Sequence, residues 1–277
     1  MKALVFVLLC VSGVGYAQRI AVSEVEDSRT TGDDYYGNRC KVLLKISGDE
    51  ARKYSFAKLL QVDKAVDDQG NDLLLEEQSG WEVEYKEKEE NSFFVPVELY
   101  SPARKAETME LAGAVRVFGP TEANGGLVWA KGISAKAGKN LLPADAPVAV
   151  TYMNKEEVLK YRKESEAKTE EGLSKLPQDM AEGLRDLLSY FSDAYSSGGD
   201  DNAIYFLITG DGSKLVNMQF VDDAGQPVEH SGYSKTGYMI VYYLTEPMTG
   251  SLGLKLSVET PDAVKDVPFD LKGVVLP

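Results

Sequence analysis

Few residues in this chain could carry out catalysis. His230 is the only histidine, so a zinc site built from several histidines is excluded. A Ser-His-Asp arrangement would also need His230, yet the sequence contains no Gly-x-Ser-x-Gly turn to hold a serine nucleophile. Paired carboxylates of the kind that hydrolyse glycosides are not marked by any spacing in the chain. We therefore predict no catalytic residue.

Two acidic turns could instead bind a cation. Asp67-Asp68 and Asp222-Asp223 are each followed two residues later by a glycine. Carboxylate oxygens suit calcium, but neither turn has the twelve-residue loop with a closing glutamate found in calcium-binding helix pairs. Asp followed by Gly is also the usual composition of a tight turn, in which Gly takes a positive φ. We favour the turn interpretation and keep these four aspartates as weak calcium candidates.

Aromatic residues form a third candidate set. Trp81 and Tyr85 lie four residues apart in the run Trp81–Glu90, so both would point to one face of a strand. Aromatic rings on a hairpin can stack on a sugar or on a protein partner. They can equally cover their own sheet, which is the more common arrangement. Trp81 and Tyr85 are therefore our candidates for a ligand or partner surface. The alternative is that both rings pack on their own sheet.

The elements that would position these residues are mostly strands. Apolar residues alternate with polar ones in four segments, as expected for antiparallel strands with one buried and one solvated face. The alternating residues are Met109, Leu111, Val115 and Val117; Ile204, Phe206 and Ile208; Leu252, Leu254, Leu256 and Val258; and Val267, Phe269 and Leu271. Short strands separated by Gly, Pro and Asp favour a β-sandwich over a parallel α/β sheet.

An internal repeat organises these strands. Four short motifs occur twice in the same order, which indicates two related domains. The pairs are Ile46–Asp49 with Ile208–Asp211, Val66–Gly70 with Val221–Gly225, Ser101-Pro102 with Glu246-Pro247, and Asp145–Val148 with Asp266–Phe269. We predict that the Asp-Asp-x-Gly turns occupy equivalent positions in the two copies.

Between the copies, the apolar spacing changes to that of a helix. Residues 155–170 are highly charged, with Glu156 and Lys160 four residues apart, which is typical of an exposed helix. After Pro177, apolar residues recur at helical spacing at Met180, Leu184, Leu187, Leu188, Phe191 and Tyr195. The spacing predicts a helical linker over residues 154–201 that packs on a sandwich through this apolar stripe.

The two Val-Asp-Asp-x-Gly turns and the closing run Val267–Pro277 resemble secreted, uncharacterised bacterial proteins with tandem immunoglobulin-like sandwiches. Together with the repeat, this predicts a mainly β chain of two immunoglobulin-like antiparallel β-sandwich domains joined by a helical segment. The domains would cover residues 18–153 and 202–277. The resemblance implies no activity, because a shared fold does not fix a function.

The first 17 residues have the composition of a signal peptide. Lys2 precedes the apolar run Ala3–Val14, and a small residue at Ala17 fits cleavage before Gln18. The run is too short to span a bilayer, so we expect no transmembrane anchor. We therefore expect a periplasmic or secreted protein, with a buried N-terminal strand as the alternative for this segment.

Charge and composition narrow the source and the partners. The net charge of −14 repels phosphate backbones, so we expect no nucleic-acid partner. The sequence has no Asn-x-Ser/Thr site, which favours a bacterial source for an exported chain. After cleavage Cys40 would be the only cysteine; we expect it to be buried, with pairing between chains as the alternative.

The hypothesis that follows is a non-catalytic secreted or periplasmic binding or structural module. Its partner would be an envelope protein or a glycan that the sequence does not identify. The alternative is a cell-envelope hydrolase or a carbohydrate-binding accessory domain, with calcium as a stabilising ion. A pocket containing two facing carboxylates would favour the hydrolase.

Overall fold

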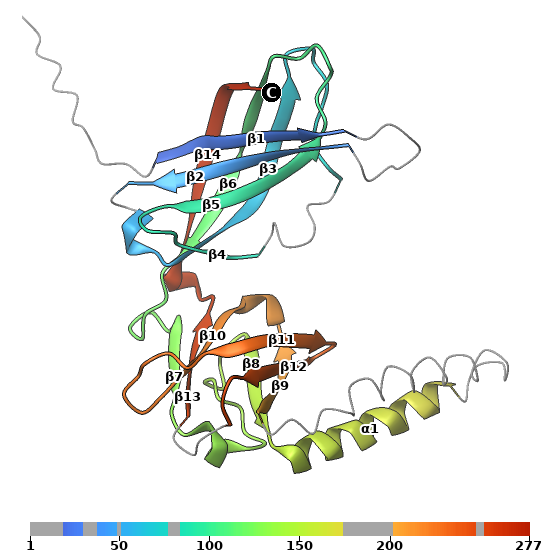
Figure 1. Cartoon of the computed structure of the whole chain (residues 1–277), viewed down its shortest axis with the longest axis vertical. Helices are drawn as coiled ribbons and strands as arrows, with labels where there is room; N and C mark the ends of the chain where they lie inside the picture. The colour runs from blue at the N-terminus through green and yellow to red at the C-terminus, as the bar shows by residue number, and fades with distance from the viewer. Residues whose placement is uncertain (1–18, 30–37, 49–50, 77–83, 174–201, 248–251) are drawn as a thin grey trace, which may run out of the picture. The chain divides into compact units, whose positions relative to one another are not determined.

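The computed structural model describes residues 19–29, 38–48, 51–76, 84–173, 202–247 and 252–277. The chain divides into two units: unit 1 is Met1–Gly119 with Ala263–Pro277, and unit 2 is Pro120–Asp262. Each unit contains two antiparallel sheets and its own hydrophobic core (Figure 1). The described chain is therefore mainly β and sandwich-like.

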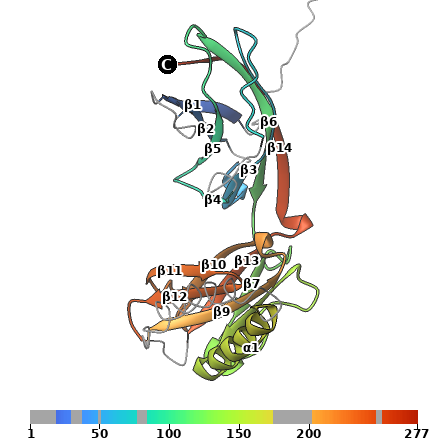
Figure 2. The ribbon, with the colours of Figure 1, turned by 90° about the vertical axis from the view of Figure 1, so that its right-hand side faces the viewer.

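Unit 1 has a three-stranded and a four-stranded sheet, in the orders β1-β2-β5 and β14-β6-β3-β4. Its strands are β1 (Arg19–Ser28), β2 (Arg39–Ser47), β3 (Phe56–Asp67), β4 (Lys86–Glu87), β5 (Phe93–Tyr100), β6 (Thr108–Phe118) and β14 (Val264–Val275). Figure 2 shows β1, β2 and β5 in one layer and β3, β6 and β14 in the other. Inward-facing residues from both layers form one core, which includes the free cysteine Cys40; the expected burial of this residue is confirmed.

Unit 2 has sheets in the orders β10-β13-β7 and β11-β12-β9-β8. Its elements are β7 (Leu127–Ala130), β8 (Val148–Met153), α1 (Lys155–Leu173), β9 (Ala203–Gly210), β10 (Leu215–Val221), β11 (His230–Thr236), β12 (Met239–Leu244) and β13 (Gly253–Val258). Single 3₁₀ turns lie at η4 (Ile133–Lys136) and η5 (Gly212–Lys214) in unit 2, at η2 (Ala51–Lys53) in unit 1, and at η6 (Pro261–Ala263), where the chain passes from unit 2 to unit 1. The core of unit 2 includes a group of aromatic side chains. The Phe220 and Tyr242 ring centroids are 5.1 Å apart, and burial raises the pKa of Tyr242 to about 12.

The strands predicted from alternation are confirmed. In β6, residues at every second position are buried, from Met109 to Val117, and the next residue, Phe118, is buried as well. In β9 the buried positions include Ile204, Phe206 and Ile208. Alternation therefore located both the strands and their core-facing sides, because the side-chain period of a strand is two.

The predicted domain boundaries do not match the two units. Residues 148–153, assigned to the first domain from sequence, form β8 and pair with β9 of unit 2. Residues 264–275, assigned to the second domain, form β14 and pair with β6 of unit 1. The order of the motifs predicts where strands lie along the chain, but it does not predict which strands pair. Strand pairing determines the two units of this chain.

The helix α1 is not a linker between domains. It connects β8 to β9, which are neighbours in one sheet, so it belongs to unit 2. Asn154 caps its first turn: its side-chain oxygen accepts a 2.9 Å hydrogen bond from the N–H of Glu157. Val158 is buried, but the next residue, Leu159, is 58% exposed. The remainder of the predicted linker, with its apolar stripe at 180–195, lies outside the described residues.

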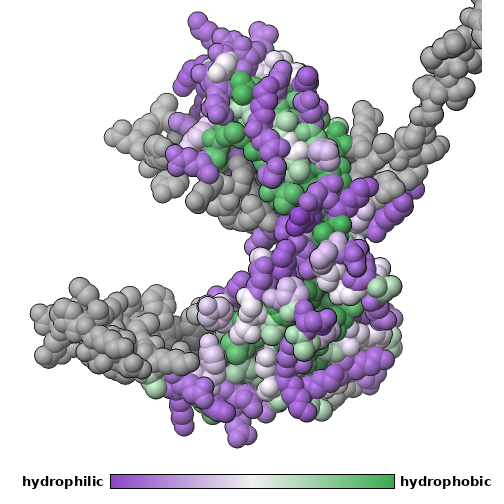
Figure 3. Space-filling view, turned by 180° about the vertical axis from the view of Figure 1, so that it is seen from behind, coloured by the Kyte–Doolittle hydropathy of each residue, from purple (hydrophilic) through white to green (hydrophobic). Residues whose placement is uncertain are grey.

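The surface fits the acidic composition of the chain. Figure 3 shows a face that is largely hydrophilic, with hydrophobic residues in patches between charged ones. Among the described residues, no helix has the length and apolar character needed to cross a membrane.

Candidate functional site

A groove in unit 1 runs between its first and last strands. Within the described chain, β1 pairs with β2 alone and β14 pairs with β6 alone, so each is the outer strand of its sheet. Pro268 in the middle of β14 fits this place, because proline has no backbone N–H to donate and is therefore confined largely to edge strands. The groove therefore lies where two strand edges, one from each sheet, border the core of unit 1.

Both bordering strands are irregular at the groove. The pairing of β1 with β2 shifts register between Val22 and Glu24, and the pairing of β14 with β6 shifts between Leu271 and Val274. Gly273 lies in the second bulge with φ of +63°, a conformation that glycine adopts without strain. Bulges bend a strand locally, and these two bend β1 and β14 along the length of the groove.

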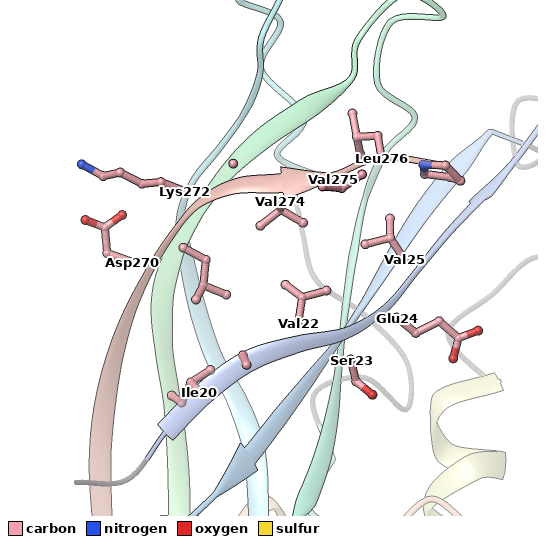
Figure 4. Close-up of a pocket in the computed structure, with 14 residues that line it drawn as sticks. Ile20, Val22, Ser23, Glu24, Val25, Asp270, Lys272, Val274, Val275 and Leu276 are labelled. Carbon is pink, nitrogen blue, oxygen red and sulfur yellow. The ribbon is translucent and has the colours of Figure 1, made fainter.

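The inside of the groove is apolar. It has a volume of about 690 Å³ and is lined by residues 20–25 and 270–277. Figure 4 shows Val22 and Val25 rising from β1 towards β14, and Val274 pointing back towards β1. Val22, Val25 and Leu271 pack against the core of unit 1, so the floor of the groove is the core itself. Val275 on the rim is 72% exposed.

The carboxylates of the groove are not arranged for hydrolysis. Glu24 and Asp270 are the acidic residues among those that line it. Figure 4 shows them on different strands and on opposite sides of the groove, neither pointing towards the other. A glycosidase needs two carboxyl groups that flank one bond of the substrate. This groove offers an apolar surface and two strand edges instead.

The aspartates proposed as calcium ligands belong to turns. Asp67 is 4% exposed, and its carboxylate accepts hydrogen bonds from the backbone N–H groups of Gln69, Asn71 and Ala103, at 3.0, 2.8 and 2.9 Å. Burial opposes its ionisation, but these hydrogen bonds outweigh burial and lower the pKa of Asp67. Asp68 accepts from the N–H groups of Glu107 and Thr108. The carboxylate oxygens of Asp67 and Asp68 thus already accept hydrogen bonds from backbone N–H groups, and a calcium ion would need these same oxygens as ligands.

The second acidic turn is more open. Asp222 accepts one 2.8 Å hydrogen bond from the N–H of Gln226, and Asp223 is exposed. Across the part of the chain that the structure describes, no three His, Cys, Asp or Glu side chains gather where they could share a metal ion.

Only one of the two aromatic candidates lies among the described residues. Trp81 lies outside the described residues. The Tyr85 ring lies 5.6 Å from the ring of Phe118 and 6.5 Å from that of Phe56. The Lys58 ammonium is 4.3 Å from the Tyr85 centroid. Tyr85 therefore covers the end of its own sheet, the alternative that its sequence pattern left open.

Sequence reasoning missed Trp129. This residue lies on the short edge strand β7 and is 36% exposed. The ammonium groups of Lys131 and Lys255 lie 4.4 and 5.3 Å from its ring centroid. Gly225 of the second acidic turn and Gly253 leave room for the indole, since a Cβ at either would come within 3.3 Å of it. A run of only four strand residues gave no clear alternation to reveal it.

The sequence reasoning also did not single out the groove, because its two walls come from opposite ends of the chain. Comparison with protein-family models, with curated protein sequences and with solved structures finds no match for this chain.

Proposed function

We propose that this chain is a non-catalytic binding or structural module that acts outside the cytoplasm of a bacterium, in the periplasm or after secretion. In this proposal residues 1–17 are a signal peptide removed on export. The observation that carries the proposal is the groove of unit 1: it is apolar inside, bordered by two strand edges, and its two carboxylates do not face each other.

We also propose that both units are immunoglobulin-like. In the described parts of the chain, each has seven strands divided into a three-stranded and a four-stranded antiparallel sheet, the division found in constant-type immunoglobulin domains. Domains of this class commonly serve as binding and spacing modules, and their function lies in local surfaces and not in the fold.

The ligand that fits the groove is an extended segment of an envelope protein. An outer strand presents backbone N–H and C=O groups that an incoming strand can pair with, and an adjacent apolar floor can receive every second side chain. The groove combines both features, because β1 and β14 each leave one edge unpaired within the described chain and Val22 and Val274 point into the space between them. A segment with alternating apolar and polar residues would suit it.

An array of immobilised heptapeptides with alternating apolar and polar residues tests this proposal. We expect the full chain to bind a subset of these peptides and Val275→Asp to weaken that binding at least tenfold. Val275 is 72% exposed, so the substitution leaves the core intact. Leu159→Asp, at a 58% exposed position on α1, is the matched control and should bind like the original chain. Equal binding by Val275→Asp, or binding to none of the peptides, would contradict a role for the groove.

A second candidate function is carbohydrate binding, and Trp129 is the observation that favours it. A partly exposed indole on a sheet surface, flanked by Lys131 and Lys255, can stack on a sugar ring while the ammonium groups bind its acidic substituents. A glycan array that includes uronic-acid oligosaccharides tests this. We expect Trp129→Ala to abolish binding and Trp129→Phe to retain part of it. Unchanged binding by Trp129→Ala would exclude Trp129 as the contact.

A further inference from the structure

Successive strands take the same places in the two units. The sheets β1-β2-β5 and β14-β6-β3 of unit 1 correspond to β8-β9-β12 and β7-β13-β10 of unit 2, and every neighbouring pair is antiparallel. Chain order agrees for five of the six positions, since β1, β2, β3, β5 and β6 follow one another as β8, β9, β10, β12 and β13 do. The position that breaks the order is the closing strand, β14 or β7.

The turns after β3 and β10 are built by the same hydrogen bonds. In each turn, the N–H of the first aspartate donates to the carbonyl four residues ahead, and the N–H of the glycine donates to the carbonyl of that aspartate. The N–H four residues ahead of the aspartate donates to its carboxylate. These three distances are 3.1, 3.0 and 2.8 Å at Asp67, and 2.9, 3.0 and 2.8 Å at Asp222. Gly70 and Gly225 have φ of +85° and +79°.

The connections after β6 and β13 also begin alike. Val117 and Val258 are buried near the ends of these strands, and each is followed three residues later by a proline, Pro120 or Pro261. In a single sandwich, the next strand would turn back and pair with the strand just completed. Here β7, which follows β6, pairs with β13, while β14, which follows β13, pairs with β6.

We infer that the two units are copies of one six-stranded sandwich that have exchanged their closing strands within a single chain, with β4 and β11 added to sheets that do not correspond. The exchange goes beyond the proposed binding function and does not depend on it. Each closing strand begins opposite the end of the strand it pairs with, as the second strand of a hairpin does. Val264, which begins β14, lies opposite Phe118 at the end of β6. Leu127, which begins β7, lies opposite Ser257 near the end of β13.

One pair of facing residues supports the equivalence of the closing strands. When Val117 is aligned with Val258, Gly113 aligns with Leu254. Gly113 faces Phe269 of β14, and Leu254 faces Ala130 of β7. Each pair thus combines one large and one small residue. In unit 1 the large residue is on the closing strand, and in unit 2 the small one is. Unit 1 requires glycine at position 113, because a Cβ there would come within 2.3 Å of the Gln61 carbonyl oxygen and 3.0 Å of the Phe269 ring.

A double-mutant cycle in the full chain tests the exchange. Ala130→Phe with Leu254→Gly would install in unit 2 the residue pair of unit 1. We expect each single variant to lower the midpoint of urea unfolding for unit 2, and the double variant to recover at least half of the loss caused by Leu254→Gly. The control combines Ala130→Phe with Leu256→Gly, since Leu256 faces Val128, and its losses should add.

A milder cycle, Ala130→Val with Leu254→Ala, covers the case in which the glycine variants do not fold. It should show coupling of the same sign. Additive losses in both the matched and the control cycles would overturn the inference, because the residue pair that fits between β6 and β14 would then not fit at the aligned place between β13 and β7.

Discussion

Asp67 and Asp222 illustrate how one sequence motif can have two structural roles. Both close the same turn, but the Asp67 carboxylate also accepts a hydrogen bond from the N–H of Ala103, which lies 36 residues further along the chain. Asp67 therefore joins the end of β3 to the connection between β5 and β6. Among the described contacts, the Asp222 carboxylate receives one backbone hydrogen bond, from Gln226 within its own turn. The sequence predicted the turn chemistry but not this long-range bond, because nothing in the motif encodes its distant partner.

This difference predicts unequal losses on substitution. Asp67→Ala would leave several backbone N–H groups without a partner next to a buried position, so we expect it to lower the free energy of unfolding by about 2–3 kcal/mol. Asp222→Ala removes a bond at an exposed turn and should cost about 0.5 kcal/mol. Urea unfolding followed by tryptophan fluorescence measures both. Equal losses would mean that the bond to Ala103 contributes nothing to stability.

The same carboxylate predicts a pH dependence. The pKa of Asp67 is lower in the folded chain than in the unfolded chain, since its hydrogen bonds outweigh the effect of burial. Its contribution to stability is therefore complete above the unfolded pKa of about 4 and is lost as the pH falls through the lower, folded value. We expect the gap in unfolding free energy between the original chain and Asp67→Asn to narrow between about pH 6 and pH 2.5. A constant gap would show that ionisation of Asp67 does not matter.

At the scale of elements, α1 contacts the sheet near its first turn. Val158 is 5% exposed and its N–H donates to the Asn154 carbonyl, whereas Leu159 is 58% exposed. The charged pattern of residues 155–170 correctly predicted an exposed helix, because i,i+4 pairs of opposite charge need no tertiary partner. It could not predict that the helix leaves from and returns to adjacent strands of one sheet.

Neighbouring residues of α1 therefore provide a matched pair of variants. Val158→Ala removes buried methyl groups and should lower the free energy of unfolding by about 2 kcal/mol. Leu159→Ala removes more carbon from an exposed position and should change it by less than about 0.5 kcal/mol. Urea denaturation of the full chain distinguishes the two. A larger loss for Leu159→Ala would place the docked face of the helix on its other side.

Sequence patterns predicted strands well and their partners poorly. Alternation in β6, β9, β13 and β14 reports only that one face is buried, and this is a local property. Three of the four repeated motifs fall at places that the inferred alignment makes equivalent: the described part of the first at the ends of β2 and β9, the second at the ends of β3 and β10, and the third before β6 and β13. The fourth does not: Val148 begins β8, while Asp266–Phe269 lie in β14, and in the inferred alignment β8 corresponds to β1 and not to β14. Both walls of the groove depend on such long-range pairing, which is why the sequence did not reveal it.

At the scale of the whole molecule, unit 1 is completed by the last strand of the chain. Unit 2 is continuous from Pro120 to Asp262, whereas unit 1 needs residues 263–277 after all of unit 2 has been made. Strand β14 supplies Phe269 and Val274 to the core of unit 1, the next residue after the strand, Leu276, joins them there, and β14 pairs with β6 along most of its length. The groove also exists only when β14 is in place. The residues of unit 1 are therefore complete only after all residues of unit 2 have been synthesised.

Deletion of residues 264–277 should accordingly unfold unit 1 and spare unit 2. Without β14, the edge of β6 and part of the core would face water, a loss far larger than the few kcal/mol that single core substitutions cost. Hydrogen exchange followed by mass spectrometry can resolve the two units in one sample. We expect peptides from β2, β3 and β6 to lose their protection, while those from β9, β12 and β13 retain it. Deletion of Pro277 alone is the control and should leave both units protected, because this residue is exposed. Retained protection of β6 after the longer deletion would show that unit 1 folds without its closing strand, and simultaneous loss in both units would show that the two fold as one cooperative structure.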